Sequence, residues 1–252
     1  MKWFLVSEQR PAARLRCVCF PWAGAGAAAY REWHTHLPKE IEVCAIQLPG
    51  RGWRVREAPA ADLDRIAEDA TTAVEELGDL PLVLFGHSFG AWLALLVARR
   101  LEAAGRSPVA LVASGRRAPS HARRDAPMRH LDDDGFVEEI QRRYGAINEE
   151  IVADRDLLRL LLPALRADVA ALEGYEHVGT PRVDCPLVAV GGSRDPVVPV
   201  AELSSWSAET NGPFDVRTFQ GGHFYLQDDP GPLLRWLRNE IGTNWVVGAG
   251  SG

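Results

Sequence analysis

Short runs of apolar residues recur along the chain, and most are followed by turn residues and then by a segment with helical spacing. The runs are of strand length and nearly all apolar, as expected of strands buried on both faces of a parallel sheet. They lie at residues 15–20, 41–46, 82–85, 109–113, 187–190 and 214–219. Helices are predicted at about 63–78, 89–104 and 231–241. This alternation predicts an open, doubly wound α/β fold with a mostly parallel central sheet flanked by helices.

The alternation is interrupted between about residues 116 and 180, where the chain is charged, arginine-rich and helical in its spacing. Because this segment falls between two predicted strands, we expect it to lie over the carboxyl ends of the strands, where lids are found. Residues 242–252 end in Gly-Ala-Gly-Ser-Gly and are interpreted as a loosely ordered tail. We therefore expect one domain over residues 1–241, with a helical lid inserted at about 116–180.

Composition narrows the class of protein. The 252 residues carry a net charge of −6, which argues against non-specific nucleic-acid binding, because such binding needs a basic surface. No apolar stretch approaches the length of a membrane span. The N-terminal apolar run is too short for a secretory signal. We expect a cytoplasmic protein that contacts neither membrane nor nucleic acid.

Cysteine and histidine spacing gives no sign of a metal site. Four cysteines fall in strand-like stretches without the C-x-x-C spacing of zinc or redox sites, and they are interpreted as reduced core thiols. These are Cys17, Cys19, Cys44 and Cys185. His34 and His36 form an H-x-H pair with no recognisable third ligand nearby. We expect no bound metal.

The pentapeptide GHSFG, residues 86–90, stands between a predicted buried strand and a predicted helix. In that context G-x-S-x-G is typical of a sharp strand-to-helix turn, whose glycines let strand and helix approach each other. The turn raises a serine hydroxyl at a helix N-terminus, where amide groups and the helix dipole favour developing negative charge. Ser88 is therefore a candidate nucleophile.

A serine hydroxyl needs a general base, and the base needs an acid to orient it. In the α/β-hydrolase arrangement these follow the serine in the order acid and then histidine, each beyond the end of a strand. Of the seven histidines, only His223 follows the last predicted strand. Asp195 comes just after the preceding strand, whereas Asp184 precedes that strand and Asp215 lies within the next one. Asp195 and His223 are the predicted acid and base.

Acyl transfer also needs N–H donors for the tetrahedral oxyanion. One donor is predicted at Phe89, the residue after the nucleophile, and the second at Ala23 or, alternatively, Trp22, in the loop after the first long strand. Residues 24–29 of that loop also fit the dinucleotide fingerprint G-x-G-x-x-A. The second strand lacks the carboxylate that this fingerprint expects at its end, although Arg51 offers a contact for a 2′-phosphate.

Taken together, these residues resemble the type II thioesterases of polyketide synthase and non-ribosomal peptide synthetase systems, which have the α/β-hydrolase fold. The resemblance extends from about residue 14 to 241. It rests on CFPWAGAGAAAYREW, IEVCAIQLPGR, FGHSFGAWLALLVAR, ASGRRAP, LLLPALRADVAALEGYEH, CPLVAVGGSRDPVVP and GGHFYL. It implies a monomer without a cofactor that hydrolyses acyl groups from the phosphopantetheine arm of acyl or peptidyl carrier proteins. It also implies a catalytic triad of Ser88, Asp195 and His223.

An acidic carrier protein, as the resemblance implies, needs a positive docking site. The arginine pairs Arg116-Arg117 and Arg123-Arg124 are the candidates for it. Two stretches depart from the family pattern, namely Gly52-Trp53 where an acidic residue is common, and RRYGAIN in the lid. The same triad would also serve a general carboxylesterase or lipase, or an acyltransferase, and a non-catalytic binding module of this fold is a further alternative.

Overall fold

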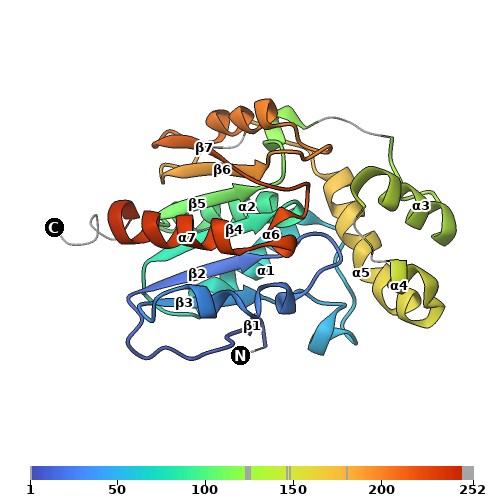
Figure 1. The fold of residues 1–252 in the computed structure, drawn as a ribbon, viewed down its shortest axis with the longest axis horizontal. Coiled ribbons are helices and arrows are strands. Elements are labelled where there is room, and N and C mark those ends of the chain that lie inside the picture. The colour runs from blue at the N-terminus through green and yellow to red at the C-terminus, as the bar shows by residue number, and fades with distance from the viewer. Residues whose placement is uncertain (1, 123–125, 146, 148, 180, 246–252) are drawn as a thin grey trace.

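One seven-stranded sheet forms the centre of the computed structural model, in the order β1-β3-β2-β4-β5-β6-β7 (Figure 1). The structure describes residues 2–122, 126–145, 147, 149–179 and 181–245. The strands are β1 (Phe4–Leu5), β2 (Leu15–Phe20), β3 (Ile41–Ile46), β4 (Leu82–His87), β5 (Ala110–Ser114), β6 (Leu187–Gly192) and β7 (Phe214–Phe219). Every pairing is parallel except that of β1 with β3. All six predicted strands are present, and only the two-residue β1 was not predicted.

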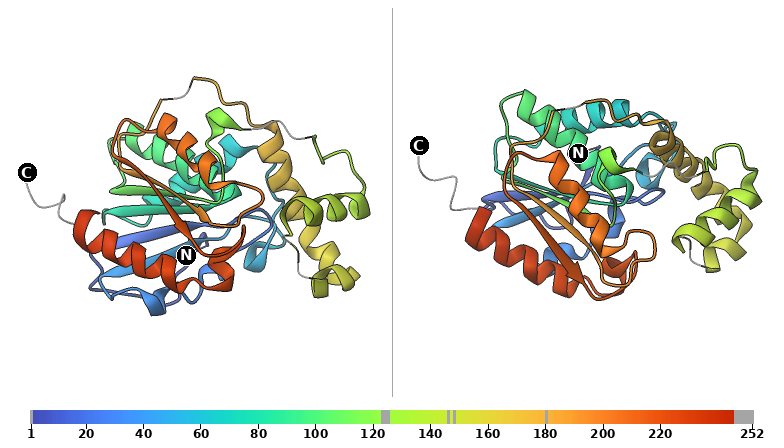
Figure 2. Two further views of the ribbon diagram at one scale, coloured as in Figure 1. Left: turned by 45° about the horizontal axis from the view of Figure 1, so that its top comes forward. Right: turned by 90° about the horizontal axis from the view of Figure 1, so that it is seen from above.

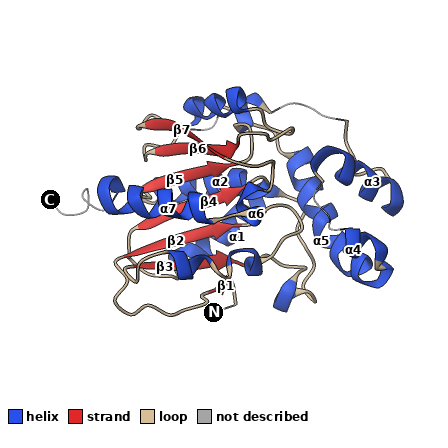
Figure 3. Ribbon diagram, in the orientation of Figure 1, coloured by secondary structure: helices blue, strands red, loops and turns tan. Residues whose placement is uncertain are grey.

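Helices cover both faces of the sheet, so the molecule has three layers (Figures 2 and 3). Two lie on one face, α1 (Leu63–Glu75) and α2 (Phe89–Ala103), while α7 (Gly231–Glu240) covers the other. The short helices η1 (Ala27–Tyr30) and η2 (Trp33–His36) pack on the same face as α7. The three helices predicted from hydrophobic spacing are therefore present, each ending within three residues of its expected end.

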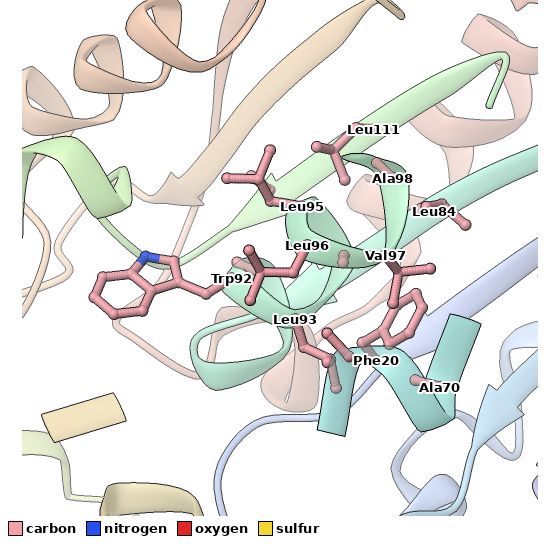
Figure 4. Packing of buried hydrophobic residues seen from close by; sticks show 14 of the residues in the cluster. Phe20, Ala70, Leu84, Trp92, Leu93, Leu95, Leu96, Val97, Ala98 and Leu111 are labelled. Carbon is pink, nitrogen blue, oxygen red and sulfur yellow. The ribbon is translucent and has the colours of Figure 1, made fainter. Parts of the chain in front are cut away.

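The sequence forms this sheet because successive residues of the central strands are buried on opposite faces. In β2, Val18 and Phe20 pack toward α1 and α2, whereas Cys17 and Cys19 pack toward α7. Helix α2 is buried over most of its surface, and Figure 4 shows its leucines among Phe20, Leu84 and Leu111 of the strands and Ala70 of α1. Because α2 starts directly after β4, this packing also fixes the position of the turn that contains Ser88.

The segment between β5 and β6 is helical, as predicted. It contains η4 (Pro119–His121), α3 (Asp133–Tyr144), α4 (Glu149–Ala153) and α5 (Arg155–Gly174). Figure 1 shows α3, α4 and α5 beyond the arrowheads of the parallel strands, at their carboxyl ends. These helices have an apolar cluster of their own, to which α5 contributes Leu158, Leu162 and Leu165, whereas Ala171 near the other end of α5 belongs to the main core.

The remaining elements are short. They are η3 (Gly52–Arg54), η5 (Val200–Glu209), α6 (Tyr225–Asp228) and η6 (Ile241–Trp245). Within the described ranges, no helix combines the length and the apolar character needed to cross a membrane.

Candidate active site

Ser88 forms the sharp turn between β4 and α2. Its backbone angles are φ 53° and ψ −112°, a conformation that costs a residue with a side chain about 1–3 kcal/mol. Glycine is required on both sides. A Cβ on Gly86 would lie 2.0 Å from the carbonyl oxygen of Gly90, and a Cβ on Gly90 would lie 2.1 Å from that of Phe20. The GHSFG sequence thus forms the predicted strained turn, with strand and helix in close contact.

The strain at Ser88 is specific to this position. Among the residues that the structure describes, Ser88 is the only non-glycine residue with a positive φ. The next residue, Phe89, is the first of α2, so its N–H lacks an intrahelical acceptor. This N–H and the positive end of the helix dipole lie beside the serine, where they stabilise negative charge.

Asp195 and His223 are brought together by the loops that follow β6 and β7. Their side chains are hydrogen-bonded, with 2.8 Å between His223 Nδ1 and Asp195 Oδ2. The other carboxylate oxygen, Oδ1, accepts the N–H groups of Val197 at 2.8 Å and Val198 at 3.1 Å. The carboxylate is therefore held by three N–H donors and has one orientation relative to the imidazole.

The contact with Asp195 determines which nitrogen of His223 is available. A carboxylate only accepts hydrogen bonds, so Nδ1 carries the proton and Nε2 has a lone pair. Nε2 is buried and has no hydrogen bond to Ser88 or to any other residue in the described ranges. The ring is surrounded by Phe224, His87 and Tyr144, with centroid distances of 4.9, 5.1 and 6.0 Å. Tyr144 belongs to α3, so a residue of the helical insertion contacts His223, the candidate general base.

The loop after β2 provides the second set of amide groups. Residues 21–26, here called the oxyanion loop, join β2 to η1, and a turn closes where the N–H of Ala25 bonds to the carbonyl of Trp22 at 3.0 Å. The N–H groups of Trp22 and Ala23 lack a hydrogen-bond acceptor within the described part of the chain. Ala23 contacts both the main core and the cluster of the helical insertion. Among the described residues, neither of the two predicted donor positions in this loop thus has an acceptor.

His87, inside the GHSFG motif, has a different environment from His223. It is fully buried, and its Nδ1 lies 2.8 Å from Ser114 Oγ, which in turn lies 2.9 Å from the hydroxyl of Tyr225. Burial, with the neighbouring His223, holds the pKa of His87 well below its ordinary value of 6.5. His87 is therefore neutral in the folded protein.

Neutral burial of His87 makes stability depend on pH. Below pH 6.5 an unfolded chain protonates this histidine whereas the folded chain does not. The contribution of neutral His87 to the free energy of unfolding is therefore complete above pH 6.5 and decreases as the pH falls below it. Between pH 7.5 and 5, we expect His87→Gln to lose less unfolding free energy than wild type, by up to about 2 kcal/mol. Chemical denaturation at several pH values measures this difference, and the exposed His36→Gln is the control. Identical pH profiles for wild type and His87→Gln would contradict the assignment.

The arginines predicted to dock a partner are partly buried where the structure describes them. The guanidinium of Arg116 lies 4.5 Å from the ring centroid of Trp92, and Arg117 forms an ion pair with Glu202. Arg117 also lines a surface hollow of about 430 Å³ between η4 and η5. Arg123 and Arg124 lie outside the described residues.

Sequence reasoning missed an ion pair next to the oxyanion loop. Arg51, considered above only as a contact for a 2′-phosphate, is buried and paired with Asp168 of α5. It is thus unavailable to a dinucleotide, and residues 24–29 lead into the four-residue η1 rather than a long helix. Both Arg51 and Asp168 lie in motifs that carry the family resemblance, PGR and LRADVAALEGYEH. Their place in these motifs was the sequence signal that could have marked them as functional.

A mostly parallel sheet, a serine at the strand-to-helix turn and an Asp-His pair on later loops define the α/β-hydrolase fold. Residues 16–240 match the family described as "Thioesterase domain". The chain belongs to this family, and the protein is a serine-hydrolase-type enzyme that hydrolyses thioesters. The motif-based resemblance is confirmed at this level.

Two relatives and one solved structure are similar to this chain over nearly all of its length. Thioesterase PikA5 of Streptomyces venezuelae is 40% identical over 253 residues, which cover 99% of this chain and 87% of PikA5. Gramicidin S biosynthesis protein GrsT of Aneurinibacillus migulanus is 34% identical over 241 residues, covering 95% and 94%. The structure of BorB, a type II thioesterase from the borrelidin biosynthetic cluster, matches with a TM-score of 0.87 at 36% identity, covering 96% of this chain and 98% of BorB.

Proposed function

We propose that the enzyme hydrolyses acyl groups from the phosphopantetheine arm of acyl or peptidyl carrier proteins, and so clears stalled or aberrant units in polyketide or non-ribosomal peptide biosynthesis. The observation that carries the proposal is the 2.8 Å hydrogen bond between Asp195 and His223. It leaves Nε2 of the imidazole without a partner among the described residues, and the ring lies 5.1 Å from that of His87, the residue before Ser88. Further support comes from the names of similar proteins: PikA5 is a thioesterase, GrsT is a gramicidin S biosynthesis protein, and BorB is a type II thioesterase from the borrelidin biosynthetic cluster.

In the proposed mechanism, Ser88 Oγ attacks the thioester carbonyl carbon while His223 Nε2 takes the hydroxyl proton. The carbonyl electrons move to the oxygen, and the N–H groups of Ala23 and Phe89 stabilise the oxyanion. Collapse breaks the C–S bond, and the pantetheine sulfur leaves with the proton from His223. Water then attacks the acyl-enzyme with His223 as base, which releases the carboxylic acid and restores Ser88. Asp195 holds the imidazole in the required tautomer and stabilises the imidazolium.

The test is hydrolysis of carrier-bound acyl thioesters of graded chain length, compared with oxygen esters of the same acyl groups. We expect higher kcat/KM for the carrier thioesters, and free acid as the product in the presence of alcohols and amines. Preference for oxygen esters would instead indicate a carboxylesterase, and acyl transfer to an added acceptor would indicate an acyltransferase.

We place the carrier near Arg116, at the carboxyl end of β5. Because an exposed ion pair contributes up to about 1 kcal/mol, Arg116→Glu is expected to raise KM for acyl-carrier substrates about 2- to 5-fold. Small soluble thioesters should show little change in KM, because they lack the acidic surface. The matched control is Arg14→Glu, an exposed arginine directly before β2, at the amino ends of the parallel strands. Equal effects on both substrate types would contradict docking at Arg116.

A further inference from the structure

A buried ion pair joins helix α5 to the loop that follows β3. Arg51 and Asp168 form two parallel hydrogen bonds, with Nη1–Oδ2 at 2.5 Å and Nη2–Oδ1 at 2.8 Å, and their side chains are 4% and 0% exposed. Asp168 Oδ2 also accepts the N–H of Gly24 at 2.8 Å, while Arg51 Nη1 donates to the carbonyl of Ala25 at 3.3 Å. The pair thus contacts two consecutive residues of the oxyanion loop, next to Ala23.

Helix α5 also approaches this loop closely. Gly24 has φ +76°, and a Cβ at this position would lie 3.1 Å from both Cβ and Cδ1 of Leu165. Asp168 lies one helical turn beyond Leu165, on the same face of α5. The peptide group between Ala23 and Gly24 therefore lies between α5 and the main core. Ala23 packs against the main core on one side and against the apolar cluster of the helical insertion on the other.

A contribution to the stability of the fold does not by itself explain why Arg51 and Asp168 are charged. Apolar residues of similar volume often stabilise a fold as well as, or better than, a buried ion pair. Apolar side chains, however, neither accept the N–H of Gly24 nor donate to the carbonyl of Ala25. The specific effect of Arg51 and Asp168 is therefore to orient the peptide groups of the oxyanion loop.

We propose that Asp168 and Arg51 are positioning residues, which hold the oxyanion loop so that the N–H of Ala23 points at the reacting carbonyl oxygen. The inference rests on the proposed function, in which this N–H stabilises the oxyanion. An oxyanion donor must lie about 2.7–3.1 Å from the oxygen that carries the charge, so small displacements of the loop reduce catalysis. Because Asp168 belongs to α5, the helical insertion is part of the machinery that orders the oxyanion hole.

The decisive variant is Arg51→Met/Asp168→Leu, which removes both charges at once and leaves no buried ion without a partner. We expect a folded protein whose kcat is lower by about 10- to 100-fold, less than the loss on removing a donor outright. KM should stay within twofold of the wild-type value. A trifluoromethyl ketone analogue of the acyl group, which forms an oxyanion with Ser88, should bind more weakly by the same factor as kcat falls.

The matched control is Arg99→Met/Glu209→Leu, because that ion pair is similarly buried, with side chains 8% and 2% exposed, and it joins α2 to η5. Thermal unfolding compares the two double variants, and the control should keep wild-type kcat. Wild-type kcat and analogue affinity in Arg51→Met/Asp168→Leu would overturn the proposal, as would equal losses in the control. Failure of the proposed function itself would appear separately, as a wild-type enzyme without thioesterase activity.

If the double variant does not fold, Asp168→Asn provides the same comparison with a smaller change. Its single amide oxygen cannot serve both Gly24 and the two guanidinium contacts of Arg51. We expect kcat to fall at least threefold with KM unchanged. Unchanged kcat in folded Asp168→Asn would then overturn the proposal.

Discussion

Replacing Ser88 by alanine is expected to leave a folded protein whose thioesterase kcat is lower by about 10⁶-fold, the loss typical of a removed serine nucleophile. The fold should persist, because the turn depends on Gly86 and Gly90 and on the packing of α2 rather than on the serine hydroxyl. KM should change little if the hydroxyl contributes to the reaction and not to ground-state binding.

Two measurements check this result. One is single-turnover hydrolysis of an acyl-carrier thioester, and the other is covalent labelling by a fluorophosphonate, which should modify the wild type at Ser88 and leave the variant unmodified. The exposed Ser7→Ala is the control and should behave as wild type. Hydrolysis near the wild-type rate by Ser88→Ala would remove Ser88 from the role of nucleophile.

The second large effect is expected for Asp195→Asn, which should lower kcat by about 10⁴-fold with the fold unchanged. The amide oxygen can still accept the N–H groups of Val197 and Val198, so the loop keeps its conformation. The amide nitrogen, however, would face Nδ1 of His223 as a donor. That contact favours the tautomer with the proton on Nε2, which cannot accept a proton from Ser88.

Asp184→Asn is the matched control for this experiment. Asp184 precedes β6 instead of following it, and its carboxylate contacts Asn211 at 2.9 Å, away from the histidine. Steady-state kinetics on one acyl-carrier thioester should show wild-type kcat for Asp184→Asn. A loss of less than tenfold for Asp195→Asn would mean that another group orients His223.

The sequence predicted the sheet well because its central strands are apolar on both faces and therefore stand out from the helical segments between them. The edge strand β1 was missed because its two residues lie in an apolar run too short to separate from a loop. Its two residues are recognisable as a strand only through their antiparallel pairing with Ala45 and Ile46 of β3, which are distant in the sequence. Ser88, Asp195 and His223 could be predicted as a triad because the order of strands along the chain determines which loops share one end of the sheet, and the hydrogen bond between Asp195 and His223 agrees with that prediction.

Arg51 and Asp168 illustrate what the same reasoning misses. Charged residues in a loop and on a helix are usually exposed, so nothing in their local sequence indicates that both are buried. They are 117 residues apart, and only the return of α5 over the oxyanion loop brings them together. For the same reason, the contact between Tyr144 and His223 was not predicted.

The separate apolar cluster of the helical insertion has a consequence for how such enzymes diverge. Substitutions among Met128, Phe136, Leu158 and their neighbours alter helices that stand over the strand ends, while the packing of the central sheet is left as it is. Selection can therefore change the helices over the strand ends in one part of the chain, while the loops that carry Ser88, Asp195 and His223 stay as they are. Tyr144 and Ile147 of the unusual stretch RRYGAIN pack against this cluster, whereas the ion pair with Arg51 ties Asp168 of α5 to the loop after β3.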